Sequence, residues 1–228
     1  MDTALLHWLQ TSDSAFPVGA FSHSMGLEGW IHEKLCPDEA SLEAYLTHFH
    51  LPLLEQIDLP ILRHAHDDAA REAWAGLEDL DCLAWACRGS HEARDASARI
   101  GRQRLRLLHE LKPAPAIQWM HQSVQAGTLR GMLPVVSGIE AHAYALPLPS
   151  AQLAYGYQTL AAILAASTKL MRIGQRAVQS ILLRLLQRLP ETIQRSQTLS
   201  RDAIGGFFPS LDLAEARHET QWTRLFIS

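Results

Sequence analysis

The sequence is poor in cysteine, lacks a long apolar run and carries no strong excess of charge. Its 228 residues include three cysteines, Cys36, Cys82 and Cys87, with no CxxC pair, which excludes a disulfide scaffold and indicates a reducing compartment. A net charge of -4 argues against nucleic-acid binding. No segment reaches the roughly 18 apolar residues of a membrane span, and the N-terminus lacks a signal peptide's basic region. We therefore expect a cytoplasmic protein that binds neither nucleic acid nor membrane.

Strand-like alternation is also scarce, and apolar residues recur at helical spacing instead. One apolar stripe contains Leu182, Leu185, Leu186 and Leu189. The stretch 92–111 repeats the pattern, with Arg99, Arg102 and Arg106 on its polar side. We interpret this side as a solvated face, and the alternative is a docking surface for an acidic partner. Short proline- and glycine-rich breaks separate such segments, and none is long enough for a linker. The prediction is all-α: one globular domain over residues 1–228, of about ten helices, with a C-terminal docking tail that is flexible from about residue 207.

The segment 14–28, SAFPVGAFSHSMGLE, concentrates groups that could do chemistry. It nearly matches the nucleophile elbow G-x-S-x-G, but a serine, Ser22, replaces the first glycine and no strand precedes it. No phosphate-binding loop is present either. We interpret the segment as a corner between helices, in which Gly19 allows an unusual φ, Ser22 caps the next helix, and Phe16 and Phe21 anchor the corner in the core. The alternative is a helical hydrolase that uses Ser22, His23 and Glu28.

Histidines are numerous, yet none stands in a convincing metal-binding pattern. His64 could share a helix face with Asp67 and Asp68, which gives too few ligands for a stable site. His218 and Glu219 begin like the zinc-protease motif H-E-x-x-H, but Trp222 occupies the second histidine position. Cys82 and Cys87 are expected to be core thiols. The sequence thus predicts no catalytic residue, metal or cofactor, and favours an assembly or binding protein over an enzyme.

Five sequence blocks follow one another along the chain. The first is Pro17–Ser22 with Gly26, Leu27 and Glu28. The second is E-x-R-x-x-S-x-x-x-G, formed by Glu92, Arg94, Ser97 and Gly101. The third is Pro134 with Gly138. The others are Lys169-Leu170 with Gly174-Gln175, and the ending H-E-x-x-x-x-R-L-F-x-S from His218. Together these blocks resemble the UreF family of urease accessory proteins. Met132 stands where many members of that family carry a histidine, so no histidine role is carried over.

The resemblance implies a function in assembling another protein's metal centre. Members of this family are all-helical homodimers that act as cytoplasmic chaperones for the nickel centre of urease. They bridge the accessory protein UreD (UreH in some organisms) and the GTPase UreG, and they modulate GTP-dependent nickel delivery to the urease apoprotein. Such a role would place the nucleotide and metal sites in the partners, in agreement with their lack in this sequence.

The resemblance also implies which residues contact the partners. The set implied for UreG is Glu28, Lys169, Asp202 and Arg224. The set implied for UreD is His218, Glu219, Trp222, Leu225 and Phe226. We expect Glu28 and Lys169 to be exposed charges that contribute under about 1 kcal/mol to stability. The tail after Gly205-Gly206 is expected to be loosely held in the free chain, because so short an end cannot form its own core.

Overall fold

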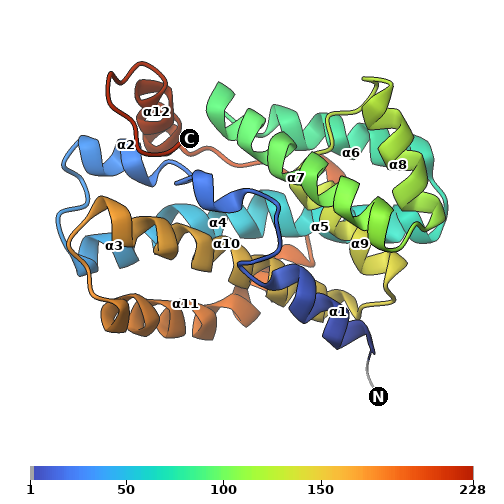
Figure 1. The fold of residues 1–228 in the computed structure, drawn as a ribbon, viewed down its shortest axis with the longest axis horizontal. Helices are drawn as coiled ribbons and strands as arrows, with labels where there is room; N and C mark the ends of the chain where they lie inside the picture. Colours follow the sequence, from blue (N-terminus) through green and yellow to red (C-terminus); the bar gives the residue numbers. More distant parts are fainter. Residues whose placement is uncertain (1–2, 228) are drawn as a thin grey trace.

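The computed structural model describes residues 3–227, and in that range the chain forms helices and no strand (Figure 1). The longer helices are α1 (Thr3–Ser12), α5 (Leu59–Ala70), α6 (Trp74–Ala86), α7 (His91–Leu111), α8 (Pro115–Gln125), α9 (Leu133–Ala143), α10 (Leu148–Leu170), α11 (Gln175–Ser196) and α12 (Pro209–His218). The shorter ones are α2 (Leu27–His32), α3 (Glu39–Tyr45) and α4 (Leu51–Leu53). The predicted all-α class is confirmed.

Helices α3, α4 and α5 form one continuous rod, so the described residues contain ten separate helices. The joints are two π-helical turns, Leu46–His50 and Leu54–Asp58. Each turn ends two residues before a proline, Pro52 or Pro60, which is the second residue of the next segment. A proline inside a helix lacks the N–H and crowds the preceding turn, which loosens the regular i to i−4 bonding there. The second turn places Asp58 in the interior.

The centre of the fold is the crossing of α5 with α9, with α7 packed on α9 and α10 on α11 (Figure 1). Gly138 of α9 makes this crossing close: a Cβ atom there would lie 2.7 Å from the Cβ of Ala65. The predicted apolar stripe of α11 is buried or partly buried on this body. Leu160 and Ile163 of α10 extend the same core, as does Leu146 just before that helix.

The corner at residues 14–28 forms as predicted in outline but not in detail. Gly19 has φ 78°, as expected, but Phe21 is 76% exposed rather than anchored in the core. The Ser22 hydroxyl donates to the Gly19 carbonyl at 2.7 Å instead of capping α2. A second glycine, Gly26 with φ 84°, begins α2, and the Ser24 hydroxyl accepts from the Glu28 amide at 3.2 Å. The corner therefore ends in a second tight turn, at Gly26, which was not predicted from the sequence.

The cysteine prediction is also partly wrong. Cys36 is buried, whereas Cys82 is exposed and Cys87 is only partly buried. The exposed thiol follows from its place on the outer side of α6, where its Sγ lies 3.7 Å from Nη1 of Arg130.

Candidate functional site

Segments distant in the sequence meet at one corner of the molecule, where α2, α12, the N-terminal end of α7 and the C-terminus lie together (Figure 1). We call the described residues after α12, 219–227, the C-terminal tail. The sequence explains the meeting in part, because α2 begins directly after the glycine turn and α7 begins directly after its N-cap, Ser90, whose hydroxyl accepts from Ala93 N at 3.0 Å. The side chains gathered at this corner form the candidate site.

Glu28 holds the C-terminal tail. Its Oε1 accepts from the amide of Leu225 at 2.7 Å, and its Oε2 accepts from the amide of Phe226 at 2.9 Å. The Ile227 amide donates to the Ser22 carbonyl at 2.9 Å. Glu28 is only 9% exposed, so the prediction of an exposed charge is wrong. Its carboxylate instead satisfies backbone donors that would otherwise lack a partner in a partly buried place.

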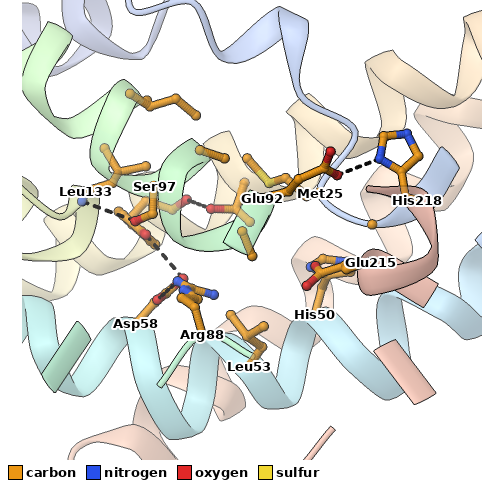
Figure 2. A pocket seen from close by; sticks show the side chains of 16 residues that line it. Met25, His50, Leu53, Asp58, Arg88, Glu92, Ser97, Leu133, Glu215 and His218 are labelled. Carbon is orange, nitrogen blue, oxygen red and sulfur yellow. Dashed lines mark hydrogen bonds and ion pairs between the residues drawn. The ribbon is translucent and has the colours of Figure 1, made fainter. Parts of the chain in front are cut away.

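His218 connects the two sides of the corner. Its Nε2 lies 3.0 Å from Oε2 of Glu28, and its Nδ1 lies 2.6 Å from Oε2 of Glu92 on α7 (Figure 2). Both carboxylates can accept together only when both ring nitrogens carry a proton. Arg224 pairs with the other oxygen of Glu92, so the corner alternates acidic and basic groups. Two carboxylates, one imidazole and one guanidinium thus contact one another across four segments.

Glu219 and Arg217 add two further attachments. Oε1 of Glu219 accepts from the amides of His91 and Glu92, at 2.9 and 3.2 Å, which caps the N-terminal end of α7. A carboxylate there also interacts favourably with the helix dipole. Arg217 pairs with Glu33 after α2 at 2.7 Å. The signature residues at the C-terminus therefore bind within this chain.

A small cavity of about 70 Å³, lined by apolar side chains and a group of polar ones, lies beneath this corner (Figure 2). Its far wall holds an ion pair between Asp58 and Arg88, and the Tyr155 hydroxyl donates to the same carboxylate at 3.2 Å. Its near wall includes His218 and Glu215, both from α12. The Ser90 hydroxyl donates to Glu215 at 2.8 Å. The volume suffices for a few water molecules, and the polar side chains in the lining provide hydrogen-bond partners for them.

Burial shifts the pKa of two side chains that line this cavity. It raises the pKa of Glu215 to about 7, against the bond from Ser90 and the nearby Arg88, and with support from Asp212 and Glu92. Burial also lowers the pKa of His50 to about 3, helped by Arg88. Glu215 therefore changes charge near neutral pH, whereas His50 is neutral there.

The raised pKa predicts a pH-dependent effect of Glu215→Gln. The folded state binds more protons at Glu215 than the unfolded state between pH of about 4.5 and about 7, so this group stabilises the fold less as pH rises through that window. Glutamine does not titrate and still accepts from Ser90. The variant should gain up to about 3 kcal/mol relative to the wild type between pH 5 and pH 8.

Urea unfolding at both pH values measures this difference. Comparison with the wild type is required because buried His23 and His50, with pKa values of about 4 and about 3, give the opposite slope at acidic pH. A stability difference between variant and wild type that stays constant from pH 5 to pH 8 would contradict the prediction.

Lys169 joins the corner from the last turn of α10. It is exposed, and its ammonium lies 5.5 Å from the ring centroid of Phe226, which is buried at 5% exposure. Lys169 also lines an open cleft between α10 and the loop that carries Phe21. Of the four residues assigned to UreG by resemblance, Glu28, Lys169 and Arg224 therefore share this corner.

The fourth residue, Asp202, lies elsewhere. It is exposed on a short turn, Arg201–Ala203, which packs against α5, where Arg201 pairs with Asp68. No contact within the described residues joins Asp202 to the corner. The structure thus groups three of the four expected residues and separates one.

The residues assigned to UreD divide into buried and exposed sets. His218 is 1% exposed and Phe226 is buried, so these two pack on the body, whereas a loosely held end was expected. Trp222 is fully exposed and Leu225 is 61% exposed. Flexibility of the tail in solution stays a prediction, and the exposed Trp222 and Leu225 are the part of it available to a partner.

Several residues of the corner were not assigned a role from the sequence. Glu92 was noted only as part of a motif, and Asp58, Arg88 and Glu215 carried no signal at all. A pairing between residues 92 and 218 joins distant positions, and a single sequence contains nothing that reports it. The motif at Glu92 was the one available hint.

The hydrolase alternative does not fit the geometry. The Ser22 hydroxyl donates to the Gly19 carbonyl, and the Glu28 carboxylate is occupied by the tail amides and His218. A nucleophile, base and orienting acid need to bond in series, and this arrangement is not formed by Ser22 and Glu28.

Residues 3–227 contain neither a cluster of metal-binding side chains nor a membrane-spanning helix. No group of three or more His, Cys, Asp or Glu side chains in that range is arranged to hold a metal ion. No helix there is both long and apolar enough to span a bilayer.

Comparisons with known proteins agree with the resemblance. A sequence model of the UreF family matches residues 37–186. The chain is 31% identical over 227 residues to a protein of Pseudomonas putida (strain GB-1) named urease accessory protein UreF, covering 100% of this chain and 99% of that protein. A protein of the same name from Paenarthrobacter aurescens (strain TC1) is 30% identical over 219 residues, 96% of each chain. This chain belongs to the UreF family of urease accessory proteins.

Proposed function

We propose that this protein is a non-enzymatic chaperone of urease maturation that acts in the cytoplasm. In this role it bridges UreD (UreH) and the GTPase UreG, and it modulates GTP-dependent delivery of nickel to the urease apoprotein. Nickel is the cargo of the assembly. We also propose that the chain acts as a homodimer, as the family resemblance implies.

The observation that carries the proposal is the convergence of family-signature residues at one corner. Glu28, Lys169, Arg224 and the tail come from regions far apart in the sequence and lie together. Convergence alone is also compatible with a purely structural cluster. The surface beside the cluster favours binding, because Phe21, Trp222 and Leu225 expose large apolar side chains there. Aromatic residues of this kind often dominate binding energy at interfaces.

Co-expression tests the proposal directly. The chain is produced together with UreD and UreG of one urease operon, and the mixture is separated by size-exclusion chromatography. We expect a complex that contains all three proteins and a loss of UreG recovery when this chain is omitted. Recovery of a UreD–UreG complex without this chain would contradict bridging.

Lys169→Ala should separate binding from folding. The side chain is exposed and its one described interaction is with the Phe226 ring, so its loss should change stability by under about 1 kcal/mol. UreG recovery in the co-expression assay should fall by more than tenfold, on the scale of an interface hot spot. Lys112→Ala is the matched control, since Lys112 is also exposed and lies over a ring, Tyr144. An equal loss of UreG recovery in the Lys169→Ala and Lys112→Ala variants would exclude a specific role for Lys169.

A further inference from the structure

One side of α7 carries a row of arginines separate from the corner. Arg99, Arg102 and Arg106 are exposed, and their spacing of three and four residues places them on one helix face. Nη1 of Arg102 donates to the carbonyl of Arg130 at 3.1 Å, which brings the segment before α9 alongside. We call Arg99, Arg102, Arg106 and Arg130 the α7 arginine face.

The charges of this face are scarcely neutralised. Among the described residues, its one ion pair is Arg106 with Glu110 at 4.0 Å, between two side chains that are both more than half exposed. Arginines on other faces are paired closely, such as Arg184 with Glu43 at 2.7 Å. The whole chain has a net charge of -4, so the concentration of positive charge here is local. Such a cluster repels itself in the free protein, and an anionic partner relieves that repulsion.

One arginine of the face, Arg130, and its neighbour Arg94 are held in place before any partner arrives. The Arg130 guanidinium lies 4.9 Å from the centroid of the Trp85 ring, and Arg94 lies 5.9 Å from the same ring. Nε of Arg94 also donates to the Arg88 carbonyl at 2.7 Å. Guanidinium groups restrained in this way lose less side-chain entropy on binding than free ones do.

The loop before α2 borders one end of this face. Gln103 donates to the Pro17 carbonyl at 3.0 Å. The Arg99 charge also adds to burial in lowering the pKa of buried His23 to about 4. Beside this loop Arg99, Arg102 and Arg106 stay exposed to solvent.

We propose that the α7 arginine face is a docking surface for a carboxylate-rich protein surface. Planar guanidinium groups pair with carboxylates through two parallel hydrogen bonds. From Arg99 to Arg106 the row rises about 10 Å along the helix, which matches acidic residues spaced by three to four positions on a partner helix. Nucleic acid is the less suitable occupant, because the rest of this chain is net negative and repels a long phosphate backbone. The inference does not depend on the bridging function.

Fluorescence anisotropy with labelled poly-L-glutamate tests the proposal on the full chain. A triple variant, Arg99→Gln with Arg102→Gln and Arg106→Gln, is compared with a control that changes Arg71, Arg172 and Arg176 to Gln. The control arginines are also exposed, so both variants lose three positive charges from the surface. At about 50 mM NaCl the wild type should bind and should weaken as salt is added. The face variant should bind at least about tenfold more weakly, and the control should stay within about threefold of the wild type.

Three results would overturn the proposal. The first is an equal loss of poly-L-glutamate binding in both variants, which would show that the binding depends only on net charge. The second is absence of binding by the wild type at low salt. The third is duplex DNA that binds as tightly as poly-L-glutamate and depends on the same three arginines, which would assign the face to nucleic acid. Circular dichroism of each variant confirms that the helices are retained.

Discussion

A Gly138→Ala variant is expected to be less stable than the wild type by about 1–3 kcal/mol. In an open helix the same change would stabilise by about 1 kcal/mol, because alanine is the better helix former. Here the added Cβ would lie 2.7 Å from the Cβ of Ala65 and 2.9 Å from the backbone nitrogen of His66. These neighbours belong to α5, and a backbone cannot move aside as a side chain can. The α5–α9 crossing would have to widen, and overpacking of this kind commonly costs about 1–3 kcal/mol or more.

Urea unfolding of Gly138→Ala beside Gly174→Ala measures the effect. Gly174 precedes α11 with φ −81°, and a Cβ there would meet nothing within 4 Å. The control should therefore unfold within about 0.5 kcal/mol of the wild type. If Gly138→Ala were as stable as the control, the two helices would not approach as closely as described.

Gly138 also illustrates what could be predicted from the sequence. Helices were predictable because apolar residues recur at helical spacing, and breaks because prolines and glycines gather between them. A glycine inside a helix carries no such local signal, since the need for it arises from the other helix. The resemblance to a family indicated that Gly101 and Gly138 matter, and the structure supplies the reason: a Cβ on Gly101 would lie 2.8 Å from the backbone nitrogen of Leu133.

The errors of the sequence-based reading have a common physical origin. Phe21 and Cys82 were expected inside because of their side chains, and Glu28 was expected outside because of its charge. Residue type gives an average preference for burial, whereas the particular position is decided by partners from distant segments. Glu28 is buried because the tail amides and His218 compensate its charge, and those partners lie about 190 residues away in sequence. The exposed arginine row on α7 was predicted correctly because a helix alone determines it.

Glu28→Ala is expected to release the C-terminal tail and to abolish partner capture. The substitution removes the acceptor for the amides of Leu225 and Phe226 and leaves His218 with one carboxylate partner. Hydrogen bonds to a charged group contribute about 1.5–3 kcal/mol each. The loss in global stability should be limited to about 2–3 kcal/mol, because the tail can detach without unfolding the body. Glu28→Gln should give an intermediate result, since an amide retains one acceptor oxygen.

Hydrogen exchange at the Leu225 and Phe226 amides reports the release, and co-purification with UreD and UreG reports its consequence. Glu43→Ala is the control, because it also removes a hydrogen-bonded carboxylate, but one in an exposed ion pair between α3 and Arg184 that should contribute under about 1 kcal/mol.

A second comparison separates an indirect role of Glu28 from direct contact with a partner. In a chain shortened after His218, partner capture should already be lost or much reduced, and Glu28→Ala should then have no additional effect, as expected when two changes act on one interaction. A further loss in the shortened chain would show that Glu28 itself touches a partner. Full capture by Glu28→Ala, despite unprotected tail amides, would show that docking of the tail is not needed for assembly. The arrangement at this corner favours the indirect role, because every described contact of the Glu28 carboxylate is with α12 or the tail.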